Sequence, residues 1–351
     1  DFVWDGADTL LFPSCRCKED EAPRFYQKTV FYRLSLSGGE AYRAFEVPYD
    51  VKEICPCGDG VHYAMAVRID HTRPDPRTHT MEECEDAEDY ILLEEMPFAT
   101  NGEGYTSRVR MTLALYNAET DETKLLTPPM FMLGAFRWAG KQLVYTGHSY
   151  TTVKAKTKGM YAYSLATGET RTLVEDGALA IYHIGEEEGT VLFTASDLKQ
   201  YGSASGQDFY KLSLAGGGCE KLLAHELVPG TSPITDSTYG SGNAFVCAQG
   251  AAYYIVLDRF QSHIRSIDAA GVQQEILGFD GGIQMLDMRG GATVFVGMQK
   301  NSLQELYVLA GGKAVCISAF NSPLLSARAV QPVHYTPFQN RAGQQIDGWG
   351  L

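Results

Sequence analysis

The stretch AYSLATGETRTL, residues 162–173, joins a short Tyr-containing run to a second run of strand-forming residues through a glycine. Gly168 can adopt a positive φ without steric cost, as a tight hairpin turn requires. Tyr and Thr on either side of the turn favour extended backbone. The stretch therefore predicts a β-hairpin, and its recurrence along the chain determines the fold class.

Six segments repeat this hairpin pattern, and their turn residues are Gly39, Asp121, Gly168, Gly217, Gly271 and Gly312. All but one of the intervals between them lie near the roughly 40–50-residue period of a propeller blade. An apolar run precedes each hairpin, at residues 9–14, 61–67, 142–148, 190–196, 252–258 and 293–299. A further strand is expected before each apolar run, at residues 1–4, 52–57, 134–138, 180–184, 233–239 and 282–288.

Each repeat thus contains four expected strands, and the chain is expected to be all-β. A single four-stranded sheet cannot cover both of its faces, whereas radially stacked sheets bury them and leave only short edges. The prediction is a β-propeller with six four-stranded blades over residues 1–330. The longest interval contains an insertion between Arg68 and Tyr105, in which the acidic residues 81–90 predict one short helix.

Composition argues against several classes of partner. The net charge of −14 and the pI near 5.0 leave no basic face for nucleic acid. The cluster Lys154, Lys156 and Lys158 is interpreted as a solvated loop. No run of about 18 apolar residues occurs in the sequence, so we expect no membrane partner.

The cysteine and histidine patterns do not favour a metal site. Two C-x-C pairs occur, Cys15 with Cys17 and Cys55 with Cys57. Within a strand such thiols share one face only two residues apart, which makes a poor zinc knuckle. The eight histidines contain no H-E-x-x-H motif. We expect no metal, no cofactor and reduced thiols in a cytoplasmic protein.

Several segments resemble the β-propeller of the prolyl oligopeptidase family of serine peptidases, most closely its acylaminoacyl-peptidase branch. LYNAETDETKLLT and YSLATGETRTL are similar to blade ends of that family, and MPFATNGEGYTSRVRMTLALYN resembles its Gly-x-Gly-aromatic insertion. CISAFNSPLL resembles the close of its last blade. VHYTPFQNRAGQQIDGWGL, residues 333–351, resembles the link into its hydrolase domain. The likeness covers nearly the whole chain.

The resemblance implies a larger parent enzyme. Family propellers usually have seven blades, so an N-terminal blade is expected to be missing, and residues 331–351 are expected to lead into a C-terminal α/β-hydrolase domain. That domain would carry the catalytic serine on a G-x-S-x-G elbow. Here GSASG, residues 202–206, has Ala204 at the central position. We therefore expect no catalytic residue in this chain, and a parent serine peptidase that acts near peptide N-termini.

In this family the propeller covers the active site, so the resemblance implies that this chain gates and positions short peptides. Dipeptidyl peptidases of the wider family hold a free amine with propeller carboxylates, and Glu94 and Glu95 are the candidates here. The alternative for this pair is a solvated edge, because adjacent strand residues point to opposite faces. Arg108 and Arg110 are two residues apart, so within a strand they would share one face. They would hold a substrate carboxylate or carbonyl, or else form ion pairs with the acidic residues 82–89.

Two other functions remain open from the sequence. The chain could be a free-standing adaptor that binds a protein partner, or a propeller enzyme of the polysaccharide-lyase type, although scattered histidines argue against the latter. Aminopeptidase, dipeptidyl-peptidase and acyl-peptide activities are not separated by these motifs. Exposed blade faces at a missing blade would favour homo-oligomers.

Overall fold

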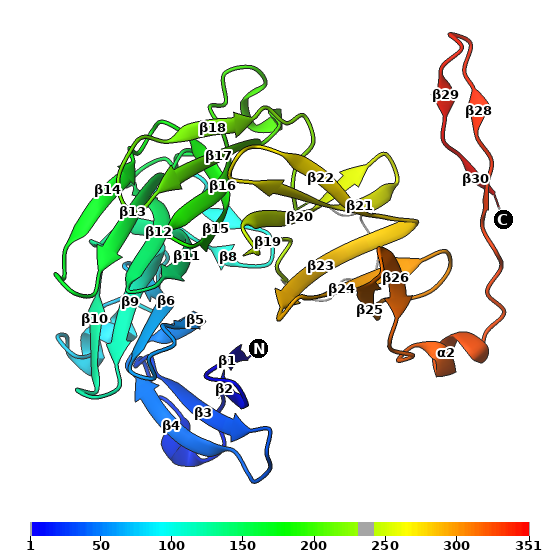
Figure 1. Ribbon diagram of the computed structural model, residues 1–351. Helices are drawn as coiled ribbons and strands as arrows, with labels where there is room; N and C mark the ends of the chain where they lie inside the picture. Colours follow the sequence, from blue (N-terminus) through cyan, green and yellow to red (C-terminus); the bar gives the residue numbers. More distant parts are fainter. Residues whose placement is uncertain (1, 231–241, 351) are drawn as a thin grey trace. The chain divides into compact units, whose positions relative to one another are not determined.

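The computed structural model of the chain describes residues 2–230 and 242–350. The chain divides into two compact units, residues 1–181 and 182–351. Within the described residues there are six four-stranded sheets, numbered here 1 to 6 along the chain, and three short two-stranded sheets (Figure 1). The predicted all-β fold with four strands per repeat is confirmed.

The first unit contains sheets 1 to 3. The strands of sheet 1 are β1 (Val3–Trp4), β2 (Thr9–Pro13), β3 (Thr29–Ser35) and β4 (Tyr42–Val47). Those of sheet 2 are β5 (Asp50–Pro56), β6 (His62–Asp70), β9 (Val109–Asn117) and β10 (Glu122–Leu125). Those of sheet 3 are β11 (Phe131–Ala139), β12 (Gln142–Ser149), β13 (Gly159–Ser164) and β14 (Thr170–Val174).

Sheet 4 starts at the unit boundary, and sheets 5 and 6 follow within the second unit. The strands of sheet 4 are β15 (Ala180–Glu187), β16 (Thr190–Ser196), β17 (Asp208–Ser213) and β18 (Glu220–Leu223). Those of sheet 5 are β19 (Phe245–Ala248), β20 (Ala251–Asp258), β21 (Gln261–Asp268) and β22 (Gln273–Phe279). Those of sheet 6 are β23 (Gly281–Arg289), β24 (Ala292–Gln299), β25 (Glu305–Ala310) and β26 (Lys313–Cys316). The strand predicted at 233–239 lies outside the described residues.

The predicted turns have the backbone conformation that their residues favour. All six turn residues have a positive φ, from 54° at Asp121 to 111° at Gly217. Glycine reaches this region without steric cost, and Asp is among the few other residues that tolerate it. Each of these turn residues lies between the third and fourth strands of its sheet, as the sequence pattern predicted.

Alternate residues of the inner strands enter separate cores on the two faces of a sheet. In β6, Tyr63, Met65 and Val67 pack with residues of sheet 1, whereas Ala64 and Ala66 pack with residues of sheet 3. Because side chains alternate along a strand, one apolar run serves both cores. β20 repeats the arrangement in the second unit, where Tyr254 packs with residues of sheet 4 and Ile255 with residues of sheet 6. These sheets thus bury both faces against neighbours.

The predicted insertion lies between β6 and β9, within sheet 2. It contains α1 (Met81–Asp86) and the hairpin of β7 (Ala99–Thr100) and β8 (Gly104–Tyr105). α1 begins with a capping box, in which the Thr80 hydroxyl accepts a hydrogen bond from the Glu83 amide and the Glu83 carboxylate accepts one from the Thr80 amide. The predicted short helix is confirmed.

The last segment of the second unit is extended. After β26 come α2 (Ser322–Ser326) and two ladders, in which β27 (His334–Tyr335) pairs with β30 (Trp349–Gly350) and β28 (Phe338–Gln339) with β29 (Gln345–Ile346). The ring of Trp349 lies 5.0 Å from that of Phe260 in the β20–β21 turn, and Asp347 pairs with Arg259. The boundary at residue 330 stays a prediction.

Candidate functional site

The four predicted substrate-binding residues lie together where the insertion returns to sheet 2. Arg110 lies on β9, and Glu95 and Glu94 precede β7. The guanidinium of Arg110 forms a two-point ion pair with Glu95, with Nη1 donating to Oε2 at 3.0 Å and Nη2 to Oε1 at 2.5 Å. The side chains of Arg110 and Glu95 are 0% and 1% exposed. We call this buried pair the clamp.

Every donor of the Arg110 guanidinium is used. Besides the two bonds to Glu95, Nε donates to the Met130 carbonyl at 3.0 Å, Nη1 to the Val109 carbonyl at 3.0 Å and Nη2 to the Tyr150 carbonyl at 2.8 Å. The guanidinium carbon also lies 3.8 Å from the centroid of the Tyr150 ring. Arginine has five N–H groups, so no donor is left for a ligand. The clamp fastens the insertion to sheets 2 and 3.

Glu94 and Arg108 form a second, exposed pair. Arg108 Nη1 donates to Glu94 Oε2 at 2.9 Å, and the two side chains are 33% and 45% exposed, respectively. The Arg108 amide donates to Glu95 Oε2 at 2.8 Å, and the Glu94 amide donates to the Ser107 hydroxyl at 3.0 Å. Backbone contacts therefore fix the position of this pair, while both charged ends remain open to solvent.

Three assumptions about this site are corrected by the structure. Glu94 and Glu95 lie outside the strands, so strand alternation does not govern their directions. Arg108 has a φ of 56° and precedes β9, so it does not share a strand face with Arg110. The alternative pairing with residues 82–89 is not found among the described residues, because Arg108 pairs with Glu94 and Arg110 with Glu95. Glu85 and Glu88 instead pair with Arg24, at 2.8 and 2.9 Å.

Hydrogen bonds keep the buried carboxylate of Glu95 charged. Burial alone would raise the pKa of Glu95, but hydrogen bonds from Arg110 and the Arg108 amide outweigh it and lower the pKa below its ordinary value of 4.5. Glu95 therefore stays ionised at neutral pH and binds its arginine as a carboxylate. Burial, together with the charges of Arg110 and Arg108, lowers the pKa of nearby His71. This histidine is therefore uncharged at neutral pH.

Two cavities adjoin the insertion within the first unit. One, of about 440 Å³, lies beside the clamp and includes Tyr150 and Val109 in its lining. The other, of about 680 Å³, is lined by aromatic residues such as Tyr49 and by His71 and His79. Arg68 lines both. Cavities of this size are typical of small-molecule sites. Arg68 and Tyr150 were missed by the sequence analysis, and the only signal was that each follows an apolar run.

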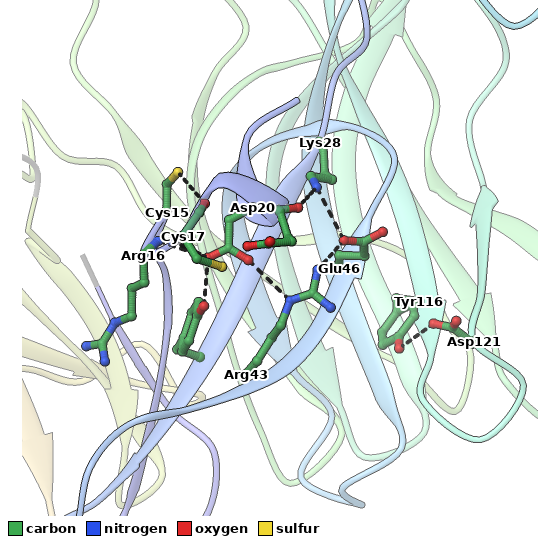
Figure 2. Close-up of polar contacts among 11 residues, drawn as sticks. Cys15, Arg16, Cys17, Asp20, Lys28, Arg43, Glu46, Tyr116 and Asp121 are labelled. Atoms are coloured by element: carbon green, nitrogen blue, oxygen red, sulfur yellow. Dashed lines mark hydrogen bonds and ion pairs between the residues drawn. The ribbon is translucent and has the colours of Figure 1, made fainter. Parts of the chain in front are cut away.

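The first C-x-C pair lies beside a buried carboxylate. Asp20 is buried in the loop between β2 and β3 and accepts hydrogen bonds from the Tyr32 hydroxyl at 2.7 Å, the Arg16 amide at 2.9 Å and Arg43 Nε at 3.3 Å (Figure 2). The Tyr32 hydroxyl is the main group that holds the pKa of Asp20 well below its usual range. In return Asp20 raises the pKa of Tyr32 to about 12. This cluster organises the loop.

The Cys17 thiol beside this cluster stays protonated at neutral pH. Hydrogen bonding to Glu19, then burial and Asp20, raise the pKa of Cys17 above its ordinary value. Among residues 2–230 and 242–350, no three His, Cys, Asp or Glu side chains are grouped as metal ligands would be. In the same part of the chain, no helix combines the length and apolar character needed to cross a bilayer.

Comparison with known proteins gives no match to a family model and none to a curated protein. Solved structures do match. The acylaminoacyl peptidase of Pyrococcus horikoshii is similar with a TM-score of 0.70 at 15% identity, over 97% of this chain and 48% of that chain. The β-propeller domain of the Trilobed protease of Pyrococcus furiosus is similar with a TM-score of 0.57 at 11% identity, over 90% and 81% of the two chains.

A prolyl endopeptidase is also similar, with a TM-score of 0.59 at 11% identity over 99% of this chain and 46% of its own. At these identities the likeness establishes the fold. This chain has the β-propeller fold found in peptidases of the prolyl oligopeptidase type, as the sequence motifs predicted. It spans about half the length of the acylaminoacyl and prolyl peptidases that it matches.

Proposed function

We propose that this chain is the β-propeller domain of a serine peptidase of the prolyl oligopeptidase type. In this role it gates and positions short peptides for an α/β-hydrolase domain of the same polypeptide, which cleaves near the peptide N-terminus. The observation that carries the proposal is the fold likeness over 97% of this chain and 48% of an acylaminoacyl peptidase. The motif order from residue 96 to residue 351 supports it independently.

Within this role the four site residues divide into two functions. Glu94 is the carboxylate that can accept a hydrogen bond from a substrate amine, because its side chain is 45% exposed. Arg108, whose side chain is 33% exposed, would bind a substrate carbonyl or carboxylate. Glu95 and Arg110 hold this exposed pair in place through the clamp and the Arg108 amide. A peptide amine would compete with Arg108 for Glu94, and solvent exposure makes that exchange inexpensive.

The eight cysteines are all free thiols. Because disulfides form in oxidising compartments, this usage fits a reducing one, and we expect the parent enzyme in the cytoplasm.

The test is chemical labelling of the full-length gene product with a fluorophosphonate probe, followed by peptide mapping. We expect one labelled serine, outside residues 1–351, because the chain contains no G-x-S-x-G elbow. Label on a serine within residues 1–351 would contradict the proposal that the catalytic serine lies outside this chain. A gene product without a reactive serine, and without a hydrolase domain after Leu351, would instead favour a free-standing binding propeller.

A further inference from the structure

The cavity of about 440 Å³ beside the clamp has an apolar wall and a charged floor. Met111 on β9 and Met132 on β11 line it from sheets 2 and 3, and the Met111 amide lies 3.5 Å from the Met132 sulfur. Pro97 and Tyr105 line it from the insertion. A small organic molecule could thus bury apolar surface here, within the size range of about 300–1,000 Å³ that ligand sites occupy.

Arg68 is the unusual group in this lining. It lies near the end of β6, is half-buried, and is paired in register with Asp50 on β5 and Met111 on β9. Residues directly opposite each other in a sheet share a face, so Arg68 lies on the face that lines the cavity. Within the part of the chain that the structure describes, its guanidinium has neither a hydrogen bond nor an ion pair.

The neighbouring carboxylate does not neutralise Arg68. Asp50 is engaged by Lys52, with Nζ 2.8 Å from Oδ1. Burying an unpaired charge is unfavourable, so a half-buried guanidinium without a counter-charge favours binding of an anion. Arg110, one strand away, shows the contrast, because Glu95 and three carbonyls satisfy all of its donors.

Two further groups favour an anion at this place. Lys154 lies exposed at the cavity, and its ammonium has no ion-pair partner among the residues described. The hydroxyl of Tyr150 likewise makes no hydrogen bond within residues 2–230 and 242–350. Among the residues described for this lining, Glu103 is the one acidic group besides Asp50, and it is exposed. The cavity therefore has a surplus of positive charge.

We propose that this cavity is a binding site for a small amphipathic carboxylate, such as the C-terminal end of a short peptide. The carboxylate binds the guanidinium of Arg68, whose planar fork offers two parallel donors that match its two oxygens. The apolar part of the ligand packs against Met111, Met132 and the Tyr150 ring. Of the described residues in this lining, Arg68 alone offers an unpaired guanidinium, and the wall is apolar, which suits a carboxylate better than a phosphate. The inference concerns binding by this chain and does not depend on peptidase activity.

The test is calorimetric titration of the purified protein with N-acetyl-alanyl-phenylalanine and, separately, with its C-terminal amide. The acid is expected to bind at least about 10-fold more tightly, because a charge-assisted hydrogen bond is lost in the amide. In Arg68→Gln this preference is expected to disappear, through weaker binding of the acid alone. Arg68→Lys keeps the charge but not the fork and is expected to retain part of the preference.

The matched control is Arg137→Gln, which removes one positive charge from β11 in the same unit. Arg137 pairs with Glu53 at 3.3 Å and does not line the cavity, so the acid preference is expected to remain. Circular dichroism and the Tm of each variant establish that it is folded. Equal affinity of the wild-type protein for acid and amide overturns the proposal without any variant. Retained preference in a folded Arg68→Gln, or displacement of the acid by equimolar inorganic phosphate, also overturns it.

Discussion

Glu94 and Glu95 are adjacent in the chain, and Arg108 and Arg110 are two residues apart, yet the two ion pairs differ in almost every physical respect. The clamp is buried, with exposed fractions of 1% and 0% for Glu95 and Arg110, whereas Glu94 and Arg108 are 45% and 33% exposed. The first pair uses all the donors of its arginine. The second makes a single side-chain bond, from Arg108 to Glu94. Sequence proximity therefore says little about which of these charges a ligand can reach.

Because of this difference in burial, breaking the two ion pairs should affect stability differently. A buried ion pair contributes most visibly when it is broken, because the remaining charge stays in a medium of low polarity. An exposed pair contributes little to stability, since water solvates both partners when they separate. We therefore expect the clamp to control the folding of the first unit and the Glu94–Arg108 pair to control ligand contact.

The largest effect is expected for Arg110→Met. This change leaves Glu95 buried without its counter-charge and removes one donor from each of three carbonyls, so the free energy of unfolding of the first unit should fall by about 3–5 kcal/mol. The measurement is denaturant unfolding. The matched control Arg108→Met should change the free energy of unfolding by less than about 1 kcal/mol. Similar losses in both variants would show that burial does not distinguish the pairs.

Removing both charges of the clamp tests the reason for that loss. In Arg110→Met/Glu95→Leu no isolated charge remains, so part of the stability should return. The recovery should be incomplete, because the Arg108 amide loses its acceptor on Glu95, and an unsatisfied buried donor costs about 1–3 kcal/mol. A double variant less stable than Arg110→Met would mean that packing, not charge, dominates the clamp.

The pH dependence of stability provides a smaller effect. The pKa of Glu95 is lower in the folded chain than its ordinary value of 4.5, so the unfolded state binds the proton more tightly. The stabilisation is therefore complete above that value and is lost as pH falls through the folded pKa. The stability difference between wild type and Glu95→Gln should shrink below about pH 4.5. A difference that is constant from pH 7 to pH 3 would contradict the assigned ionisation.

The smallest effect is expected for Glu94→Gln in the full-length enzyme. A charge-assisted hydrogen bond contributes about 1.5–3 kcal/mol when buried, and exposure reduces this. KM for a peptide with a free amine should rise by about 3- to 10-fold, while that for an N-blocked peptide should not change. Equal KM values for wild type and variant with both peptides would favour the alternative, that Glu94 is a solvated edge residue without a substrate contact.

The repeats were predictable because their causes are local. Gly168 and its counterparts need a positive φ, and runs such as residues 61–67 alternate between two cores, so turn chemistry and strand period were sufficient. Even the exception at Asp121 has the expected backbone. The four-strand repeat could therefore be derived from the sequence without any knowledge of tertiary contacts.

The site was predictable only as a set of residues. The segment from residue 71 to residue 108 has no period, so the burial of Glu95 depends on contacts with β9 and with Tyr150 that no local pattern encodes. Arg108 has a positive φ and precedes β9, so it does not share the strand face that was expected for it and Arg110. For Arg68 the one signal, its place after an apolar run, was not specific, because an arginine near a strand end usually reaches solvent.

The most direct test is a pair of double-mutant cycles on the free energy of unfolding of the first unit. One cycle uses Glu95→Gln and Arg110→Met, and the other Glu94→Gln and Arg108→Met. The coupling energy between Glu95 and Arg110 should exceed about 1.5 kcal/mol, and that between Glu94 and Arg108 should stay below about 0.5 kcal/mol. Equal coupling energies in the two cycles would contradict the assignment of one pair to structure and the other to ligand contact.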